Sequence, residues 1–145
     1  MPEATLLVPN WNGGKRLARL LDTALFQTHP FTQILVADNG SSDGSAEHAE
    51  QLGAQVLRLG GNLGFARAVN RGLEKVSTPW IAIVNNDVEL AANWLERLLG
   101  ACLENDAWFA TGRLYSLARD GRLDGTYDTL CRGACAWRAG AGRPD

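Results

Sequence analysis

Short apolar runs alternate with amphipathic stretches over the first 113 residues, a pattern typical of βα units around a parallel sheet. Four runs predict strands, at residues 5–8, 34–37, 55–59 and 80–84. The first, second and fourth are apolar enough to be buried on both faces, as strands of a parallel sheet are. The pattern therefore predicts the α/β fold class, with a mostly parallel sheet and flanking helices.

Amphipathic helices are predicted between and after these strands, at about residues 15–27, 45–52, 65–76 and 93–103. Asn93 suits the N-cap position of the last helix. From about residue 112 onward the chain is rich in Gly and Arg and shows no sustained period. We therefore expect one domain over residues 1–112, and an irregular C-terminal segment over residues 113–145 rather than a second domain.

Composition and charge exclude several classes of protein. The chain has 145 residues, 46% of them hydrophobic and 21% charged, which is typical of one globular domain. A net charge of −2 gives no global electrostatic reason to bind nucleic acid. No apolar run approaches the roughly 18 residues of a membrane span, and no signal-peptide pattern follows Met1. We expect a cytoplasmic protein, with peripheral contact at the inner face of the membrane left open.

The cysteines fit the same compartment. Cys102, Cys131 and Cys135 are an odd number, form no CxxC pair and have no histidine at zinc-ligand spacing. We therefore expect reduced thiols.

Polar segments follow the first two predicted strands, at the sheet edge where open α/β sheets bind ligands. Pro9-Asn10-Trp11-Asn12-Gly13-Gly14 follows the first strand, and its glycines allow close backbone approach before a helix start. Taken alone, this segment is better explained as an ordinary βα loop with an Asn cap. Asp38 leads the segment after the second strand, where its carboxylate can accept the imide N–H of uracil or thymine or a ribose hydroxyl. Turn chemistry is the alternative there.

The segments after the third and fourth strands suit a diphosphate and a cation. Residues 60–72 form a glycine-rich loop entering a helix, and the helix-start amides and Arg67 both favour negative charge. Asn85-Asn86-Asp87 closes the fourth strand. One carboxylate with phosphate oxygens and waters suffices for magnesium, while capping of a turn by Asp87 is the alternative.

In this order, the four segments resemble the inverting family 2 glycosyltransferases with the A-type fold, especially bacterial rhamnosyltransferases. The resemblance extends from Thr5 to about Leu99. It is carried by Val8-Pro9-Asn10-Trp11-Asn12, Val36-Ala37-Asp38-Asn39-Gly40-Ser41-Ser42-Asp43-Gly44, Gly61-Asn62-Leu63-Gly64-Phe65-Ala66 with Asn70 and Gly72, and Val84-Asn85-Asn86-Asp87-Val88. It implies a Rossmann-like nucleotide-diphospho-sugar transferase fold.

The resemblance also implies residue roles. Pro9 lines the base pocket, Asp38 binds the pyrimidine, and Asp87 is the carboxylate on a divalent cation, Mg²⁺ or Mn²⁺. Many members of the family have Asp where this chain has Asn85. Asn at this position is common among rhamnosyltransferase-like relatives, so the resemblance favours dTDP-rhamnose over a UDP-linked donor. From position and resemblance together, the expected donor-binding residues are Pro9, Asn10, Asn12, Asp38, Asn39, Ser41, Asn62, Gly64, Phe65, Arg67, Asn70, Asn85, Asn86 and Asp87.

The acceptor half of such enzymes, with its acidic general base, has no counterpart in residues 113–145. Asp124 and Asp128 are poor candidates for that base, so no catalytic residue is assigned. We expect nucleotide-sugar binding with little or no transfer to a saccharide or lipid-linked acceptor, in a chain that stops mid-enzyme. An apolar face left where the acceptor half docks would favour a homodimer.

Three other functions remain as alternatives. A sugar nucleotidyltransferase would carry a basic glycine-rich signature after the first strand, where this chain has Pro9-Asn10-Trp11-Asn12. A non-catalytic nucleotide-sugar-binding module is compatible with the missing base. A dehydrogenase is disfavoured because the first βα turn lacks Gly-x-Gly-x-x-Gly.

Overall fold

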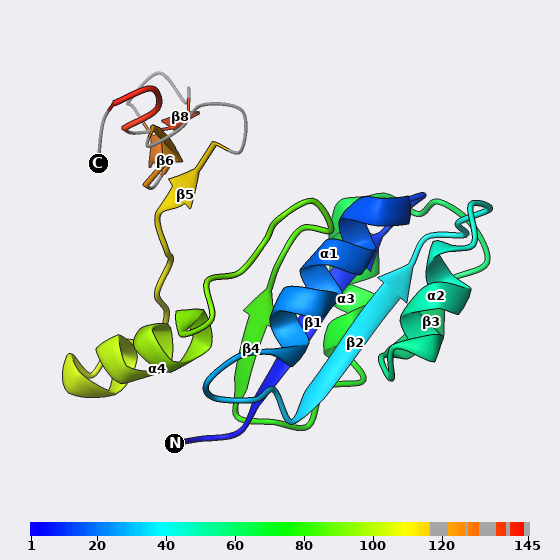
Figure 1. The fold of residues 1–145 in the computed structure, drawn as a ribbon, viewed down its shortest axis with the longest axis horizontal. Helices are drawn as coiled ribbons and strands as arrows, with labels where there is room; N and C mark the ends of the chain where they lie inside the picture. The colour runs from blue at the N-terminus through cyan, green and yellow to red at the C-terminus, as the bar shows by residue number, and fades with distance from the viewer. Residues whose placement is uncertain (117–121, 127, 131–135, 139, 144–145) are drawn as a thin grey trace. The chain divides into compact units, whose positions relative to one another are not determined.

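The computed structural model describes residues 1–116, 122–126, 128–130, 136–138 and 140–143 (Figure 1). Two compact units divide the chain, Met1–Arg97 and Leu98–Asp145. The elements of the first unit, with the helix that leaves it, are β1 (Ala4–Asn10), α1 (Gly14–Leu25), β2 (Gln33–Asp38), α2 (Ser45–Gln51), β3 (Gln55–Arg58), α3 (Phe65–Leu73), β4 (Trp80–Ile83) and α4 (Trp94–Glu104). The two units divide within α4, between Arg97 and Leu98. The domain boundary expected after residue 112 stays a prediction.

The first unit is built on one parallel sheet with strand order β3-β2-β1-β4. β1 is central, and its register places Asn10 beside Asp38 at the carboxyl end of β2. On its other side, Leu7 pairs with Ile83 of β4. The predicted α/β class with a mostly parallel sheet is confirmed, and the carboxyl ends of all four strands lie at one edge.

Helices cover the two faces of the sheet unequally. Every residue of β1 is buried, and successive side chains point to opposite faces. Leu6 and Val8 belong to a core cluster with α1 and α2, whereas Leu7 belongs to a second cluster with α3. A Cβ at Gly72 of α3 would lie 2.3 Å from Leu7 Cδ1, so a glycine is what lets α3 lie this close to β1. The larger core thus lies under α1.

The first helix ends at Leu25, two residues before its predicted end, because Gln27 has a different role. Its Nε2 donates to the carbonyls of Thr23 at 3.1 Å and Ala91 at 2.8 Å, and its Oε1 accepts the N–H of Leu95 at 3.0 Å. A buried glutamine therefore joins the end of α1 to the start of α4.

The expectation that the fourth strand is buried on both faces is wrong. Ile81 and Ile83 are 41% and 48% exposed. β4 is an edge strand, and the cluster beneath α3 reaches Leu7 and Leu35 but not β4. The homodimer that we expected from an apolar face at the docking position of the acceptor half stays a prediction.

The second unit contains short antiparallel pairs rather than the irregular tail expected from the sequence. β5 (Leu114–Tyr115) pairs with β6 (Leu123–Gly125), and β7 (Asp128–Leu130) pairs with β8 (Ala136–Arg138). Strands of two or three residues are too short to produce a periodic sequence signal.

The cysteine prediction is tested at one position. Cys102 is a buried free thiol, while Cys131 and Cys135 lie outside the described residues. Across the part of the chain that the structure describes, no helix is both long and apolar enough to cross a membrane.

Candidate functional site

A cavity of about 450 Å³ opens where the strands of the first unit end. Residues at the end of β1, in the loops after the four strands and at the start of α3 line it: Pro9, Asn10, Trp11, Asn39, Asn62, Gly64, Phe65, Asn85, Asn86 and Asp87. The lining combines amides, one carboxylate and two aromatic rings. Such a mixture suits a ligand with a ring and hydroxyl groups.

The structure brings most of the predicted donor-binding residues together here. The predicted residues that do not line the cavity are Asn12, Asp38, Ser41, Arg67 and Asn70. Arg67 and Asn70 are exposed on α3, and their roles stay predictions.

Asn12 and Ser41 connect two loops instead. The N–H of Asn12 donates to Ser41 Oγ at 2.9 Å, and Asn12 Oδ1 accepts the N–H of Ser42 at 2.9 Å. The loop after β1 is thereby fixed to the loop after β2.

Asp38 lies behind the cavity, with both carboxylate oxygens engaged. Oδ1 accepts hydrogen bonds from Asn10 Nδ2 at 2.9 Å and Ser41 Oγ at 2.5 Å. Oδ2 accepts the N–H groups of Gly40 at 3.2 Å and Ser41 at 3.0 Å. The side chain is 3% exposed, so the predicted contact between Asp38 and a pyrimidine does not fit this geometry. The neighbouring Asn39 lines the cavity in its place.

Asn10 joins the ends of three strands. Its Nδ2 lies 2.9 Å from Asp38 Oδ1, 3.1 Å from Ser41 Oγ and 3.0 Å from Ser45 Oγ. Its Oδ1 accepts a hydrogen bond from Asn86 Nδ2 at 2.9 Å. With 1% exposure, Asn10 is a buried polar group whose bonding groups are all used.

The loops after β2 and β3 are held together by backbone approach and one side chain. Asn39 Oδ1 accepts the N–H of Leu63 at 3.2 Å. Gly40 has a φ of 76°, and a Cβ there would lie 2.8 Å from Gly61 Cα. Only glycine therefore fits at position 40, and the start of α3 is fixed beside the cavity.

Trp11 is a site residue that our sequence prediction missed. It lines the cavity although 56% of it is exposed, and Phe65 is 58% exposed on the same lining. An indole is an unusual side chain in the polar turn formed by residues 10–14. That mismatch is the signal that could have identified it.

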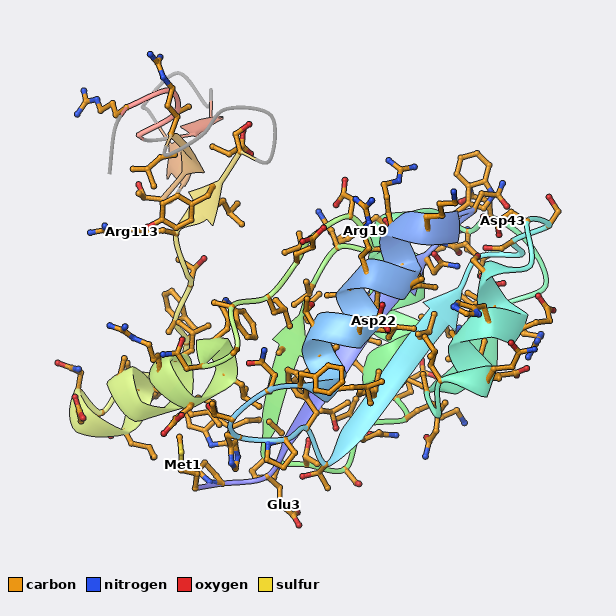
Figure 2. The ribbon with its side chains drawn as sticks, in the orientation of Figure 1. Met1, Glu3, Arg19, Asp22, Asp43 and Arg113 are labelled. Carbon is orange, nitrogen blue, oxygen red and sulfur yellow. The ribbon has the colours of Figure 1, made fainter. Side chains whose placement is uncertain are left out.

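Charge in the cavity is concentrated on Asp87, which is the one acidic residue of the lining among the residues that the structure describes. No group of three or more His, Cys, Asp or Glu side chains that could hold a metal occurs among the described residues. Asp43 lies at the same end of the sheet (Figure 2). The hydrogen bond from the Ser45 side chain lowers the pKa of Asp43 below its ordinary value. Partial burial opposes this shift, and hydrogen bonds from the backbone N–H groups of Ser45 and Gly14 lower the pKa further. The protein thus supplies one carboxylate to the cavity itself.

Comparison with known proteins gives consistent matches. The profile described as Glycosyl transferase family 2 matches residues 5–132. N-acetylglucosaminyl-diphospho-decaprenol L-rhamnosyltransferase of Mycobacterium tuberculosis is 30% identical over 123 residues, which are 76% of this chain and 39% of that enzyme.

Solved structures share the fold. The chain is similar to S. aureus TarS 1-349 in complex with UDP-GlcNAc, with a TM-score of 0.66 and 22% identity, covering 72% of this chain and 32% of TarS 1-349. It is also similar to the mannosyltransferase PcManGT from Pyrobaculum calidifontis in complex with GDP-Man and Mn²⁺, with a TM-score of 0.59 and 22% identity over 63% of this chain and 29% of the other. The chain thus spans between 29% and 39% of these proteins.

Proposed function

Because the chain belongs to glycosyl transferase family 2, we propose that its cavity binds the nucleoside-diphosphate-sugar donor of a glycosyltransferase. The observation that carries this proposal is the lining itself. Loops after four parallel strands contribute amides, a carboxylate and aromatic rings to one cavity at the carboxyl edge of the sheet. Ligands of open α/β sheets bind at this edge.

The groups in the lining match the parts of a nucleoside diphosphate. The exposed ring of Trp11 offers a stacking surface for a base, and the amides of Asn39 and Asn86 offer hydrogen bonds to base or ribose. The N-terminus of α3, whose first turn has no acidic residue, offers N–H groups and a favourable dipole to a diphosphate. Binding of this kind needs no concentrated positive charge.

The residues present fit a divalent cation that is bound jointly by the protein and by the phosphates of the donor. Magnesium is commonly held by one or two carboxylates together with substrate phosphates and waters, and Asp87 supplies one exposed carboxylate on the cavity. Such a cation, when bound, offsets the charge of the leaving diphosphate. PcManGT in complex with GDP-Man and Mn²⁺ supports this proposal.

For the donor we propose a dTDP-linked sugar, with dTDP-rhamnose as the first candidate. Asn85 and the similarity to a rhamnosyltransferase support this choice, whereas TarS 1-349 was solved with UDP-GlcNAc. The name of the mycobacterial relative supports a lipid-linked saccharide as acceptor.

Transfer itself needs a base that removes the proton of the acceptor hydroxyl. The residues of the cavity bind and orient the donor, and none of them is assigned as that base. We therefore propose donor binding without efficient transfer for this chain.

Titration calorimetry with dTDP, UDP and GDP tests the proposed function. We expect one dTDP per chain, bound more tightly than GDP, with Mg²⁺ or Mn²⁺ raising the affinity at least about tenfold through charge neutralisation. The same titrations in EDTA give the metal-free affinity. Absence of heat with all three nucleotides, with and without metal, would refute the proposal.

Replacement of Trp11 by alanine should weaken dTDP binding by about 5- to 150-fold, since stacking of a base on an aromatic ring contributes about 1–3 kcal/mol. Phe26→Ala is the matched control, because Phe26 is 81% exposed at the C-terminal end of α1 and absent from the cavity lining. Calorimetric affinities of both variants measure the effect. Equal affinities would exclude Trp11 as the stacking residue.

A further inference from the structure

A hydrogen-bond relay runs from Asp38 through Asn10 to Asn86, and its chemistry permits only one direction. An ionised carboxylate has acceptors and no donor, so Asn10 must turn its Nδ2 towards Asp38 Oδ1, at 2.9 Å. The Oδ1 of Asn10 then faces the other way and can only accept. It does so from Asn86 Nδ2, also at 2.9 Å.

The end of the relay is a fixed carboxamide on the cavity. Asn86 donates one N–H of its Nδ2 to Asn10, which fixes the orientation of the carboxamide and leaves Oδ1 free to accept at the cavity that Asn86 lines beside Asp87. No donor to Asn86 Oδ1 occurs in the described part of the chain. An amide oxygen in this position can accept a hydrogen bond from a hydroxyl group or bind a cation. An amide N–H there would repel a cation, because its hydrogen carries a partial positive charge.

We propose that Asp38 and Asn10 are positioning residues: the negative charge of Asp38 sets the direction of the relay and so presents the oxygen of Asn86, not its nitrogen, to the donor site. The identity of the ligand rests on the proposed function, while the relay itself does not. Asp38 and Asn10 are 3% and 1% exposed, so water does not compete for these bonds.

Gly13 lies against the last link of the relay. A Cβ at this position would lie 2.3 Å from Asn10 Oδ1 and 2.8 Å from Asn86 Nδ2. The backbone of Gly13 has a φ of −74°, which any residue adopts. The position therefore needs glycine for the space that the Asn10–Asn86 bond occupies, and not for its conformation.

Reversal of the polarity tests the proposal. In Asp38→Asn, the new amide nitrogen faces Asn10 Nδ2, which favours a flip of both Asn10 and Asn86. In Asn86→Asp, the new carboxylate faces Asn10 Oδ1, and Asp38 prevents Asn10 from flipping. In the double variant the amide at position 38 can donate to Asn10 Oδ1, and Asn10 Nδ2 can donate to the carboxylate at position 86. The Ser41 and Ser45 hydroxyls rotate to suit either direction.

The experiment is a double-mutant cycle on the full chain, with unfolding in urea as the first measurement. Each single variant should lower the folding equilibrium constant by about tenfold, because it leaves a buried polar group facing a like partner. Independent effects would multiply to about a hundredfold loss, whereas a reversed relay predicts a loss of about tenfold or less in the double variant. The carboxylate introduced by Asn86→Asp is next to that of Asp87. The repulsion between the two is present with either residue at position 38, so it cancels in the cycle.

A second measurement follows Asn86 itself. In the wild type its side-chain N–H protons should exchange slowly with solvent, and in Asp38→Asn they should exchange much faster and dTDP affinity should fall about tenfold. Asp22→Asn also removes one carboxylate, from an exposed position in the second half of α1 (Figure 2), and should be additive with Asn86→Asp. If Asp38→Asn does not fold, Gly13→Ala takes its place in the cycle, because the added methyl group breaks the hydrogen bond between Asn10 and Asn86. In the Gly13→Ala background, Asn86→Asp should then cause no further loss of stability.

The outcomes separate the relay from the proposed function. Additive losses at positions 38 and 86, or unchanged exchange of the Asn86 amide in Asp38→Asn, would overturn the relay even if dTDP binds. Coupling in the unfolding data without dTDP binding by the wild type would support the relay and refute the proposed function.

Discussion

Asp87→Asn should abolish the enhancement of dTDP binding by Mg²⁺ or Mn²⁺ while leaving the fold unchanged. The substitution keeps the shape of the side chain and removes the acidic group that Asp87 contributes to the cavity lining. A charge-assisted contact contributes about 1.5–3 kcal/mol, so affinity in the presence of metal should fall by about 10- to 150-fold. Affinity in EDTA should change little, because Asp87 then has no cation to hold.

Calorimetric titrations with and without metal measure both affinities, and Asp22→Asn is the control for loss of one negative charge. Asp22 is exposed on α1 and absent from the lining. Equal metal enhancement in the wild type and in Asp87→Asn would place the cation elsewhere. Loss of affinity in EDTA as well would instead indicate that the Asp87 carboxylate contacts the nucleotide directly.

The sheet and its helices could be predicted from the sequence because each element carries a local signal. Leu17, Leu20, Leu21 and Ala24 recur at helical spacing and are all buried in α1. Residues after each strand could be placed together because parallel strands end at the same edge. Burial of β4 was wrong because edge position depends on strand order, which no single segment encodes.

The roles of individual polar residues were harder to predict. Asp38 and Asn39 are adjacent at the tip of one strand, yet Asp38 is buried behind the cavity and Asn39 lines it. The difference arises from Asn10, which lies 28 positions away in sequence and donates to Asp38. Position along a strand indicates where a cavity forms, whereas long-range hydrogen bonds decide which of two neighbouring residues lines it. The same holds for Gln27, whose partners include Ala91 and Leu95.

Leu20→Ala should destabilise the first unit by about 2–5 kcal/mol, which is a large part of the roughly 5–15 kcal/mol that stabilises a typical domain. Leu20 is 0% exposed in α1 and belongs to the cluster formed with Leu6 and Val8 of β1. Loss of its side chain removes buried apolar contacts and leaves a cavity that packed neighbours can fill only in part.

Leu25→Ala makes the same chemical change in the same helix at a position that is 47% exposed, and should alter the free energy of unfolding by no more than about 0.5 kcal/mol. Urea unfolding followed by circular dichroism measures both variants. Equal losses would contradict the packing of α1 on the sheet. Binding of dTDP by Leu20→Ala should decrease only in proportion to the folded fraction of the variant. Because α1 begins directly after the loop that carries Trp11, a greater decrease would show that packing under α1 also holds that loop in place.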